Sequence, residues 1–139
     1  MEPERFVLDS YAVLAFLEGA AGWERVRELL QEALMGQCEL LMSMVNLGEV
    51  VYITERKRGL PKAQEVLARI DELPIKVLDA DRAHTLTAAH IKAQWSMAYA
   101  DCFAVALAKL EDATIVTGDP EFRLLEAASV VSIAWLGAK

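Results

Sequence analysis

Short runs of apolar and β-branched residues alternate along the chain with longer segments whose apolar positions recur every three or four residues. Runs of the first kind are typical of buried strands, and the second spacing is typical of amphipathic helices. The short runs predict four strands and a candidate fifth, at residues 6–8, 38–43, 74–79, 113–118 and 129–135. The helical spacing predicts helices at residues 11–19, 23–36, 44–59, 60–73, 82–94, 99–111 and 119–127.

Several of these expected helices carry signals at their ends. Gly59 follows the basic turn "ERKR", which is typical of a helix C-terminus, and Pro61 stands in the first turn of the next helix. Asp81 precedes the helix expected at 82–94, where its carboxylate can cap the first turn.

The alternation of strands and helices predicts an α/β fold. Neighbouring parallel strands need crossover connections, and helices placed between the strands supply them. We therefore expect a three-layer α/β/α domain with a mainly parallel sheet of four to five strands. The length of 139 residues suits a single domain, so we expect residues 1–139 to form one unit.

Composition and charge narrow the function classes. The chain is 55% apolar and 25% charged, which is typical of a well-packed globular protein. A net charge of −7 argues against a protein that coats nucleic acid, although a bound cation can supply positive charge where a phosphate sits. The acidic N-terminus resembles no signal peptide and no apolar run is long enough to span a membrane, so we expect a cytoplasmic protein with Cys38 and Cys102 reduced and buried.

Four acidic residues stand in apolar surroundings. Asp9 and Asp119 each follow an expected strand, whereas Glu49 and Asp101 lie within expected helices. An aspartate after a strand, taken alone, is most often a turn residue or a helix cap. All four together lack basic neighbours, since the nearest cations in sequence are Arg5 for Asp9 and Lys109, two helical turns away, for Asp101.

The topology expected from the sequence brings strand ends together. The carboxyl ends of parallel strands face one edge of the sheet, where ligands bind. Carboxylates gathered there without cations must take up protons or recruit a metal ion, and oxygen ligands favour Mg²⁺ or Mn²⁺ over zinc. Zinc is a poor alternative, because His84 and His90 are spaced to face different sides of one helix; we expect both to be surface or core-edge residues.

Three stretches together resemble a PIN domain of the VapC-type toxin ribonucleases found in prokaryotic toxin–antitoxin pairs. They are "FVLDSYAVLAFLEG", "MVNLGEVVYI" and "SMAYADCFAVALAKLEDATIVTGDPEF", and the likeness extends from residue 6 to about residue 135. Each motif is short, but their order and their flanking elements make the combination specific.

The resemblance implies a metal-dependent endoribonuclease that hydrolyses RNA phosphodiester bonds with Mg²⁺ or Mn²⁺. The family's four acidic positions map onto Asp9, Glu49, Asp101 and Asp119, as catalytic residues and metal ligands. Residues beside them, expected to orient the carboxylates and waters, are Ser10, Asn46 and Thr117.

The resemblance also implies an RNA substrate, a homodimer and a cognate antitoxin protein that blocks the acidic site. A basic side chain such as arginine from an inhibitor would suit that site. The densest basic cluster, residues 55–59 with Lys62, is either an RNA contact or a solvated helix end. Further RNA-contact candidates are Lys92, Trp95, Tyr99, Lys109 and Arg123, of which the two aromatic residues can equally belong to the core or an interface.

Other function classes fit less well. A haloacid-dehalogenase-type phosphatase needs a second aspartate where this chain has Tyr11, and a phosphotransfer receiver domain needs an acidic pair and a lysine that do not appear. The chain has no G-x-x-x-x-G-K motif of a P-loop NTPase. A non-catalytic module that binds a metal ion or a basic peptide would use the same carboxylates, so the sequence leaves this alternative open.

Overall fold

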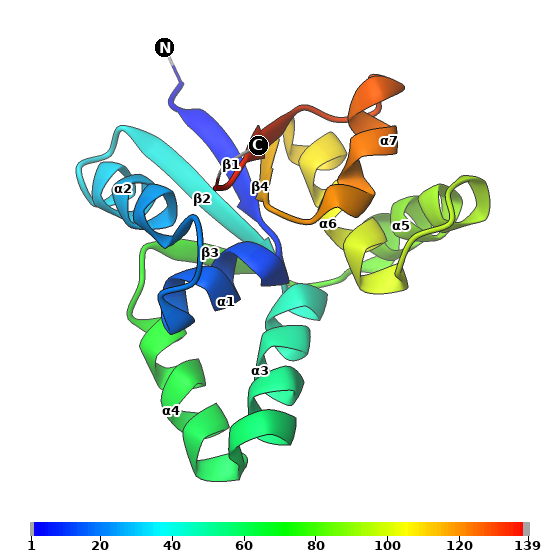
Figure 1. Ribbon diagram of the computed structural model, residues 1–139. Coiled ribbons are helices and arrows are strands. Elements are labelled where there is room, and N and C mark those ends of the chain that lie inside the picture. Colours follow the sequence, from blue (N-terminus) through cyan, green and yellow to red (C-terminus); the bar gives the residue numbers. More distant parts are fainter. Residues whose placement is uncertain (1, 138–139) are drawn as a thin grey trace.

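Five parallel strands form the centre of the computed structural model, which describes residues 2–137 (Figure 1). Their order across the sheet is β3-β2-β1-β4-β5, and every neighbouring pair is parallel. The strands are β1 (Glu4–Leu8), β2 (Cys38–Ser43), β3 (Ile75–Leu78), β4 (Thr114–Thr117) and β5 (Ile133–Trp135).

Helices cover both faces of this sheet. The helical elements are α1 (Ser10–Glu18), α2 (Trp23–Leu34), α3 (Met44–Arg58), α4 (Leu60–Asp71), α5 (Arg82–Gln94), α6 (Tyr99–Glu111), the 3₁₀ turn η1 (Pro120–Phe122) and α7 (Arg123–Ala127). One core packs α1, α2, α3 and α4 against the sheet, and the other packs α5, α6, η1 and α7. The α3–α4 pair projects beyond the end of the sheet (Figure 1).

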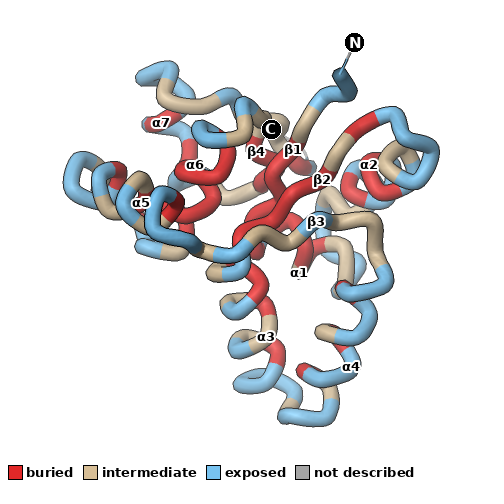
Figure 2. The backbone as a smooth tube through the Cα atoms, turned by 180° about the vertical axis from the view of Figure 1, so that it is seen from behind, coloured by how far each residue is buried: buried red, intermediate tan, exposed pale blue. Residues whose placement is uncertain are grey.

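Alternation along the strands accounts for the two cores. On β1, Phe6 and Leu8 enter the first core while Val7 enters the second, as expected for side chains that point to opposite faces in turn. On β4, Val116 and Ile115 divide in the same way. Figure 2 shows buried residues concentrated along the central strands and on the helix sides that face them. The expected three-layer α/β/α architecture is confirmed.

The differences from the expected elements are confined to their ends. β1 begins two residues earlier than expected, because pairing with β2 starts at Glu4. The candidate fifth strand is real but reduced to Ile133–Trp135, and Ser129 adopts a positive φ of 58° in the turn before it. The helix expected at 119–127 divides into η1 and α7.

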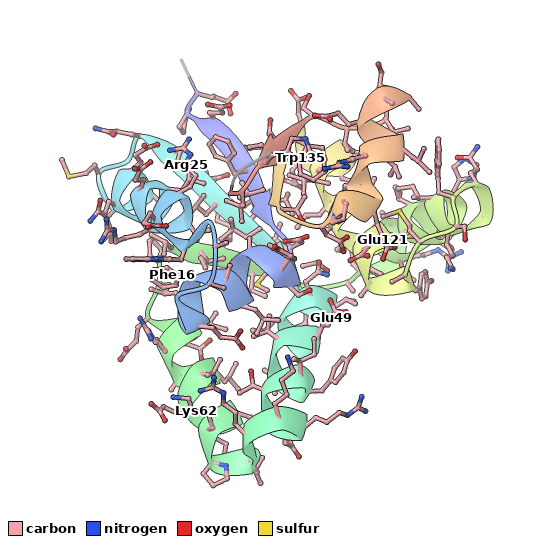
Figure 3. The ribbon with its side chains drawn as sticks, in the orientation of Figure 1. Phe16, Arg25, Glu49, Lys62, Glu121 and Trp135 are labelled. Atoms are coloured by element: carbon pink, nitrogen blue, oxygen red, sulfur yellow. The ribbon has the colours of Figure 1, made fainter. Side chains whose placement is uncertain are left out.

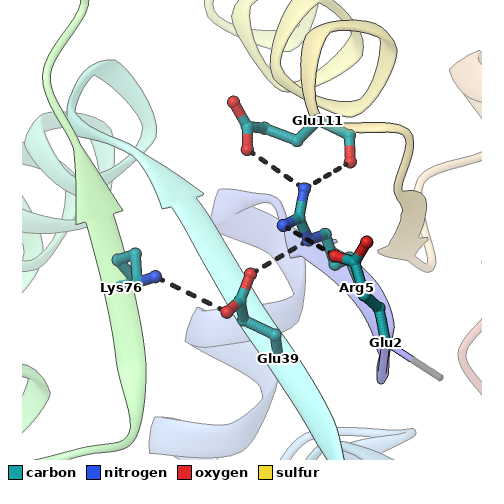
Figure 4. Close-up of polar contacts among 5 residues, drawn as sticks. All are labelled: Glu2, Arg5, Glu39, Lys76 and Glu111. Atoms are coloured by element: carbon teal, nitrogen blue, oxygen red, sulfur yellow. Dashed lines mark hydrogen bonds and ion pairs between the residues drawn. The ribbon is translucent and has the colours of Figure 1, made fainter.

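Arg5 lies at the amino-terminal end of the sheet, away from the strand ends where Asp9 stands (Figure 4). Its Nε is 3.1 Å from Glu39 Oε1, and its Nη1 donates to the Glu111 backbone carbonyl at 3.2 Å. Lys76 Nζ approaches the same Glu39 side chain at 3.5 Å. These contacts join β1, β2, β3 and the end of α6, so the cation nearest to Asp9 in the sequence is engaged at the far end of its strand.

No helix within residues 2–137 is long and apolar enough to cross a membrane.

Leu41→Ala should lower the free energy of unfolding by about 2–5 kcal/mol, because Leu41 is 1% exposed on β2 and its truncation leaves a cavity under the second core. The matched control, Leu86→Ala, removes the same atoms from a side chain that is 54% exposed on α5 and should change stability by less than about 0.5 kcal/mol. Urea unfolding of the three proteins measures both values. Equal losses in the two variants would contradict this assignment of the core.

Candidate active site

The strand order places a switch point between β1 and β4. The chain leaves β1 toward β2 on one side and later crosses to β4 on the other side, so the connections after these two strands diverge and open a crevice. Leu8 pairs with Val116 at the carboxyl ends of the two strands. Asp9 and Asp119 follow these ends directly, so both stand at the carboxyl edge of the sheet, as expected.

Both strand-end aspartates are helix caps. Asp9 Oδ1 accepts a hydrogen bond from the Ala12 amide at 2.9 Å and begins α1, while Asp119 Oδ1 accepts from the Glu121 amide at 2.9 Å and begins η1. The capping interpretation of each residue is therefore correct, yet each of these bonds uses only Oδ1. The caps fix the position of the two carboxyl groups and leave their second oxygens for other partners.

The two helical carboxylates reach the same edge from α3 and α6. Ser10 Oγ, in the first turn of α1, donates to Glu49 Oε1 at 2.6 Å and so joins α1 to α3. Asp101 lies in the first turn of α6 and is 8% exposed. The neighbouring residue Ala100 offers its backbone carbonyl to Asn46 Nδ2 at 3.0 Å, which joins α3 to α6 beside Asp101.

Two further polar groups complete this framework. Thr117, fully buried at the end of β4, accepts a hydrogen bond from the Asp119 amide at 3.0 Å through its hydroxyl. Asn46 is also fully buried, and its Oδ1 has no hydrogen-bond partner among the described residues. A buried amide oxygen without a donor is costly, so this atom marks a place where the protein alone does not satisfy its own polar groups.

The carboxyl groups lie near enough to disturb each other's ionisation. Burial raises the pKa of Asp9 to about 7, hydrogen bonds from the Thr117 side chain and the Ala12 amide oppose the rise, and the charges of Asp119 and Glu49 add to it. Burial likewise raises the pKa of Asp101 to about 7, with repulsion from Asp119, Asp9, Glu49 and Glu121 in that order. Within residues 2–137, none of the ion pairs involves any of these carboxylates.

Glu121 is a fifth acidic residue at this edge that the sequence reasoning missed. It stands in η1, two residues after Asp119, and Figure 3 shows it and Glu49 as labelled side chains of the carboxylate-bearing elements. The only signal in the sequence is its spacing from Asp119, which is also ordinary for a short acidic helix start. Its repulsion of Asp101 is what associates it with the site.

The donor set suits a hard divalent cation. All candidate ligands are oxygens, burial and neighbouring carboxylates raise the pKa of Asp9 and of Asp101, and the Asn46 oxygen finds no donor among the described residues. As they stand, however, no three His, Cys, Asp or Glu side chains of the described chain form a closed ligand group. An ion would thus have to draw the carboxylates inward or keep several water ligands, as Mg²⁺ commonly does.

Three of the residues considered for zinc are buried, whereas His90 is exposed, as expected. His84 is buried, and its Nε2 lies 2.9 Å from the Phe103 carbonyl oxygen with the two rings edge to face. Its expected place at the surface or the edge of the core is therefore wrong, because α5 packs this side chain directly onto α6. Cys38 and Cys102 are free and buried, as expected.

Comparison with known proteins identifies the family. The model of the PIN domain family matches residues 6–128. The chain belongs to the PIN domain family. No curated protein matches its sequence.

Solved structures of toxin–antitoxin proteins share the fold. VapBC2 from Rickettsia felis, bound to a DNA fragment of its promoter, has a TM-score of 0.74 at 15% identity and covers 95% of this chain and 98% of its own. DNA-bound VapBC from Salmonella typhimurium has a TM-score of 0.72 at 18% identity, covering 94% and 97%. VapC20 from Mycobacterium tuberculosis, a toxin that cleaves the sarcin–ricin loop, has a TM-score of 0.68 at 16% identity, covering 86% and 93%. At such identities the likeness establishes the PIN fold.

Asp101→Asn should stabilise the metal-free protein at pH 8. The folded-state pKa of Asp101 is about 7 against an ordinary value of 3.8, so the protonated carboxyl favours the fold. That contribution is complete below pH 3.8 and is lost as the pH rises through 7. Each unit of the pKa shift corresponds to about 1.4 kcal/mol of unfolding free energy. The neutral amide should restore this stability at pH 8, where the carboxyl is ionised, and should add none at pH 4, where the carboxyl is still protonated.

Thermal unfolding in EDTA across pH 4–8 measures this difference. Asp71→Asn, which changes an exposed aspartate at the end of α4, is the matched control and should follow the wild type at every pH. An Asp101→Asn protein less stable than the wild type at pH 8 would show that the carboxylate is favourably partnered in the metal-free fold.

Proposed function

We propose that this PIN domain is a metal-dependent endoribonuclease that hydrolyses RNA phosphodiester bonds. The observation that carries the proposal is the gathering of Asp9, Glu49, Asp101 and Asp119 at the β1–β4 switch point without any ion-pair partner among the described residues. Buried carboxylates that repel one another destabilise a fold, and a divalent cation is the ligand that reverses this effect. The whole of residues 1–139 would act as one domain.

Asp9 and Asp101 would hold the ion, Mg²⁺ or Mn²⁺, because their pKa values show the greatest need for a positive charge. Asp119 would complete the set directly or through water. An ion bound there supplies polarisation of a phosphate and a lowered pKa for a water molecule. Glu49 would bind a second ion or accept the proton of the attacking water at Oε2, since its Oε1 already accepts from Ser10.

Three polar side chains would orient these groups. Ser10 fixes Glu49, Asn46 fixes the start of α6 next to Asp101, and Thr117 holds the backbone of Asp119. Removing such partners typically weakens metal affinity or activity by about 10- to 100-fold. The unpartnered Asn46 oxygen would accept a hydrogen bond from a water molecule of the site.

The solved neighbours favour a role as the toxin of a toxin–antitoxin pair in the cytoplasm. They include VapC toxins and VapBC complexes, of which VapC20 cleaves an RNA loop. A pocket of about 50 Å³ among α1, α3 and α4 would accept one side chain of a cognate antitoxin; it is lined by Leu14, Leu17, Glu18, Thr54, Arg58, Lys62 and Val66. Arg58 belongs to the basic cluster 55–59, about 13 Å along α3 from Glu49, so that cluster would contact a partner or RNA beyond the reacting phosphate.

A homodimer is part of the proposal. Met44 and Tyr99 expose apolar surface at the starts of α3 and α6, two helices that pack together. A second copy covering this surface would remove it from water. We treat the two as one candidate patch, because each stands within two residues of the Asn46–Ala100 hydrogen bond that joins the starts of α3 and α6.

Purified wild-type protein should cleave a mixed single-stranded RNA pool with Mg²⁺ or Mn²⁺ and should lose this activity in EDTA. Asp101→Asn should abolish cleavage, because it removes a metal ligand, whereas Asp71→Asn should keep wild-type activity. Gel analysis of 5′-labelled RNA measures each rate. Full activity in Asp101→Asn would refute the assignment of the site, and stoichiometric metal binding without cleavage of varied RNAs would favour the non-catalytic binding module.

Light scattering at micromolar concentration should give twice the chain mass of 15.4 kDa. Met44→Glu should shift the protein toward a monomer, because a charge in the apolar patch opposes its burial. A wild-type monomer at that concentration would show that the homodimer is wrong.

A further inference from the structure

Tyr11 stands at the rim of the carboxylate site. None of the metal-binding or proton-transfer roles proposed above involves its side chain. It lies in the first turn of α1, two residues after Asp9, and is 42% exposed. Its aromatic ring is partly in solvent at the edge where an RNA phosphate would have to approach.

Gly118 holds the ring in place. A Cβ atom at Gly118 would lie 2.7 Å from Tyr11 Cζ and 2.9 Å from its hydroxyl oxygen, and would also overlap Cε1. The ring therefore lies directly on the backbone that links Thr117 to Asp119. No hydrogen bond of the Tyr11 hydroxyl is found in the part of the chain that is described, so packing, including the close approach to Gly118, positions the ring.

The rings of the other two tyrosines contact side chains of the protein. Tyr52 on α3 carries the Arg56 guanidinium 5.3 Å from its ring centroid, and Tyr99 packs edge to face on Phe103 at 5.0 Å. For Tyr11 neither kind of contact exists among the described residues. It combines an exposed ring, close packing on Gly118 and immediate proximity to two site aspartates.

The negative charge of the protein gives an aromatic ring at this place a particular value for RNA binding. The protein carries a net charge of −7 and its site is acidic, so attraction to phosphates contributes little to RNA binding beyond a bound ion. Stacking of a base on an aromatic ring is independent of that charge and is available only to an unpaired base. A ring at the rim thus adds affinity and discriminates single-stranded from duplex RNA.

We propose that Tyr11 is a specificity-determining residue that stacks on a nucleobase flanking the cleaved phosphate. This inference rests on the proposed ribonuclease function. It predicts a preference for an unpaired base that depends on this one side chain. It also gives a reason for glycine at position 118, because a Cβ atom there would overlap the ring.

The experiment uses one short single-stranded RNA whose cleavage position has been mapped with wild-type protein. Two further substrates each carry one abasic ribose: in one it lies on the 5′ side of the cleaved bond, and in the other on the 3′ side. Tyr11→Ala should lower kcat/KM on the intact RNA roughly 5- to 100-fold, mainly through KM, because a base–aromatic stack contributes this much to binding. Tyr11→Phe keeps the ring and should stay close to the wild type.

The abasic substrates test the contact itself. Wild-type protein should lose a similar factor on one of them, and Tyr11→Ala should lose nothing further on that same RNA. Gly118→Ala should mimic Tyr11→Ala because the added methyl displaces the ring, and it should have no additional effect in the Tyr11→Ala background. Tyr52→Ala is the matched control, which removes another exposed tyrosine and should keep the wild-type ratio between intact and abasic RNA.

The results separate the two proposals. No cleavage by wild-type protein would overturn the ribonuclease function together with this inference. Wild-type cleavage with unchanged kcat/KM in Tyr11→Ala, or equal losses on intact and abasic RNA, would overturn the stacking role alone. A change of oligomeric state in Tyr11→Ala by light scattering, without an effect specific to the abasic position, would instead assign the ring to contact with a second copy.

Discussion

The pairing of β1 with β4 is the constraint on which the remaining structure depends. β1 is the central strand, bonded to β2 on one side and to β4 on the other, so its ends are fixed from both sides. The register that pairs Leu8 with Val116 brings two strand ends to the same level. Because the chain leaves them in opposite directions, the backbone opens where Asp9 and Asp119 follow. The position of these carboxylates is thus a consequence of sheet topology, and the same sheet core that stabilises the fold maintains it.

The same carboxylates stabilise the helices as caps and destabilise the fold as buried charges. Asp9 begins α1 and Asp119 begins η1 as caps, a contribution typically of about 1 kcal/mol for each. The burial that accompanies this position raises the pKa of Asp9 to about 7. A group that is favourable as a cap is unfavourable as a charge, and either protonation or a bound cation removes the conflict. Stability and ligand binding are therefore coupled through the same atoms.

The sequence was sufficient for the fold and for the strand-end residues. Short apolar runs and helical spacing predicted the strands and helices, with η1 and α7 expected as one helix, and the parallel topology predicted that Asp9 and Asp119 stand at one edge. Periodicity carries no information on contacts between distant segments, so the Ser10–Glu49 and Asn46–Ala100 hydrogen bonds could not be derived from it.

Residues with ordinary local roles were misjudged for the same reason. His84 was expected at the surface or the edge of the core, yet α6 covers it. Glu121 and Tyr11 became relevant only through the approach of η1 and Gly118 in space. The distribution of cations shows why such contacts matter for function. Arg5 is paired at the opposite end of the sheet, and among residues 2–137 no ion pair involves the carboxylates of the acidic edge. A polyanion approaching that edge must then rely on a bound ion for its phosphate and on an uncharged surface for its bases.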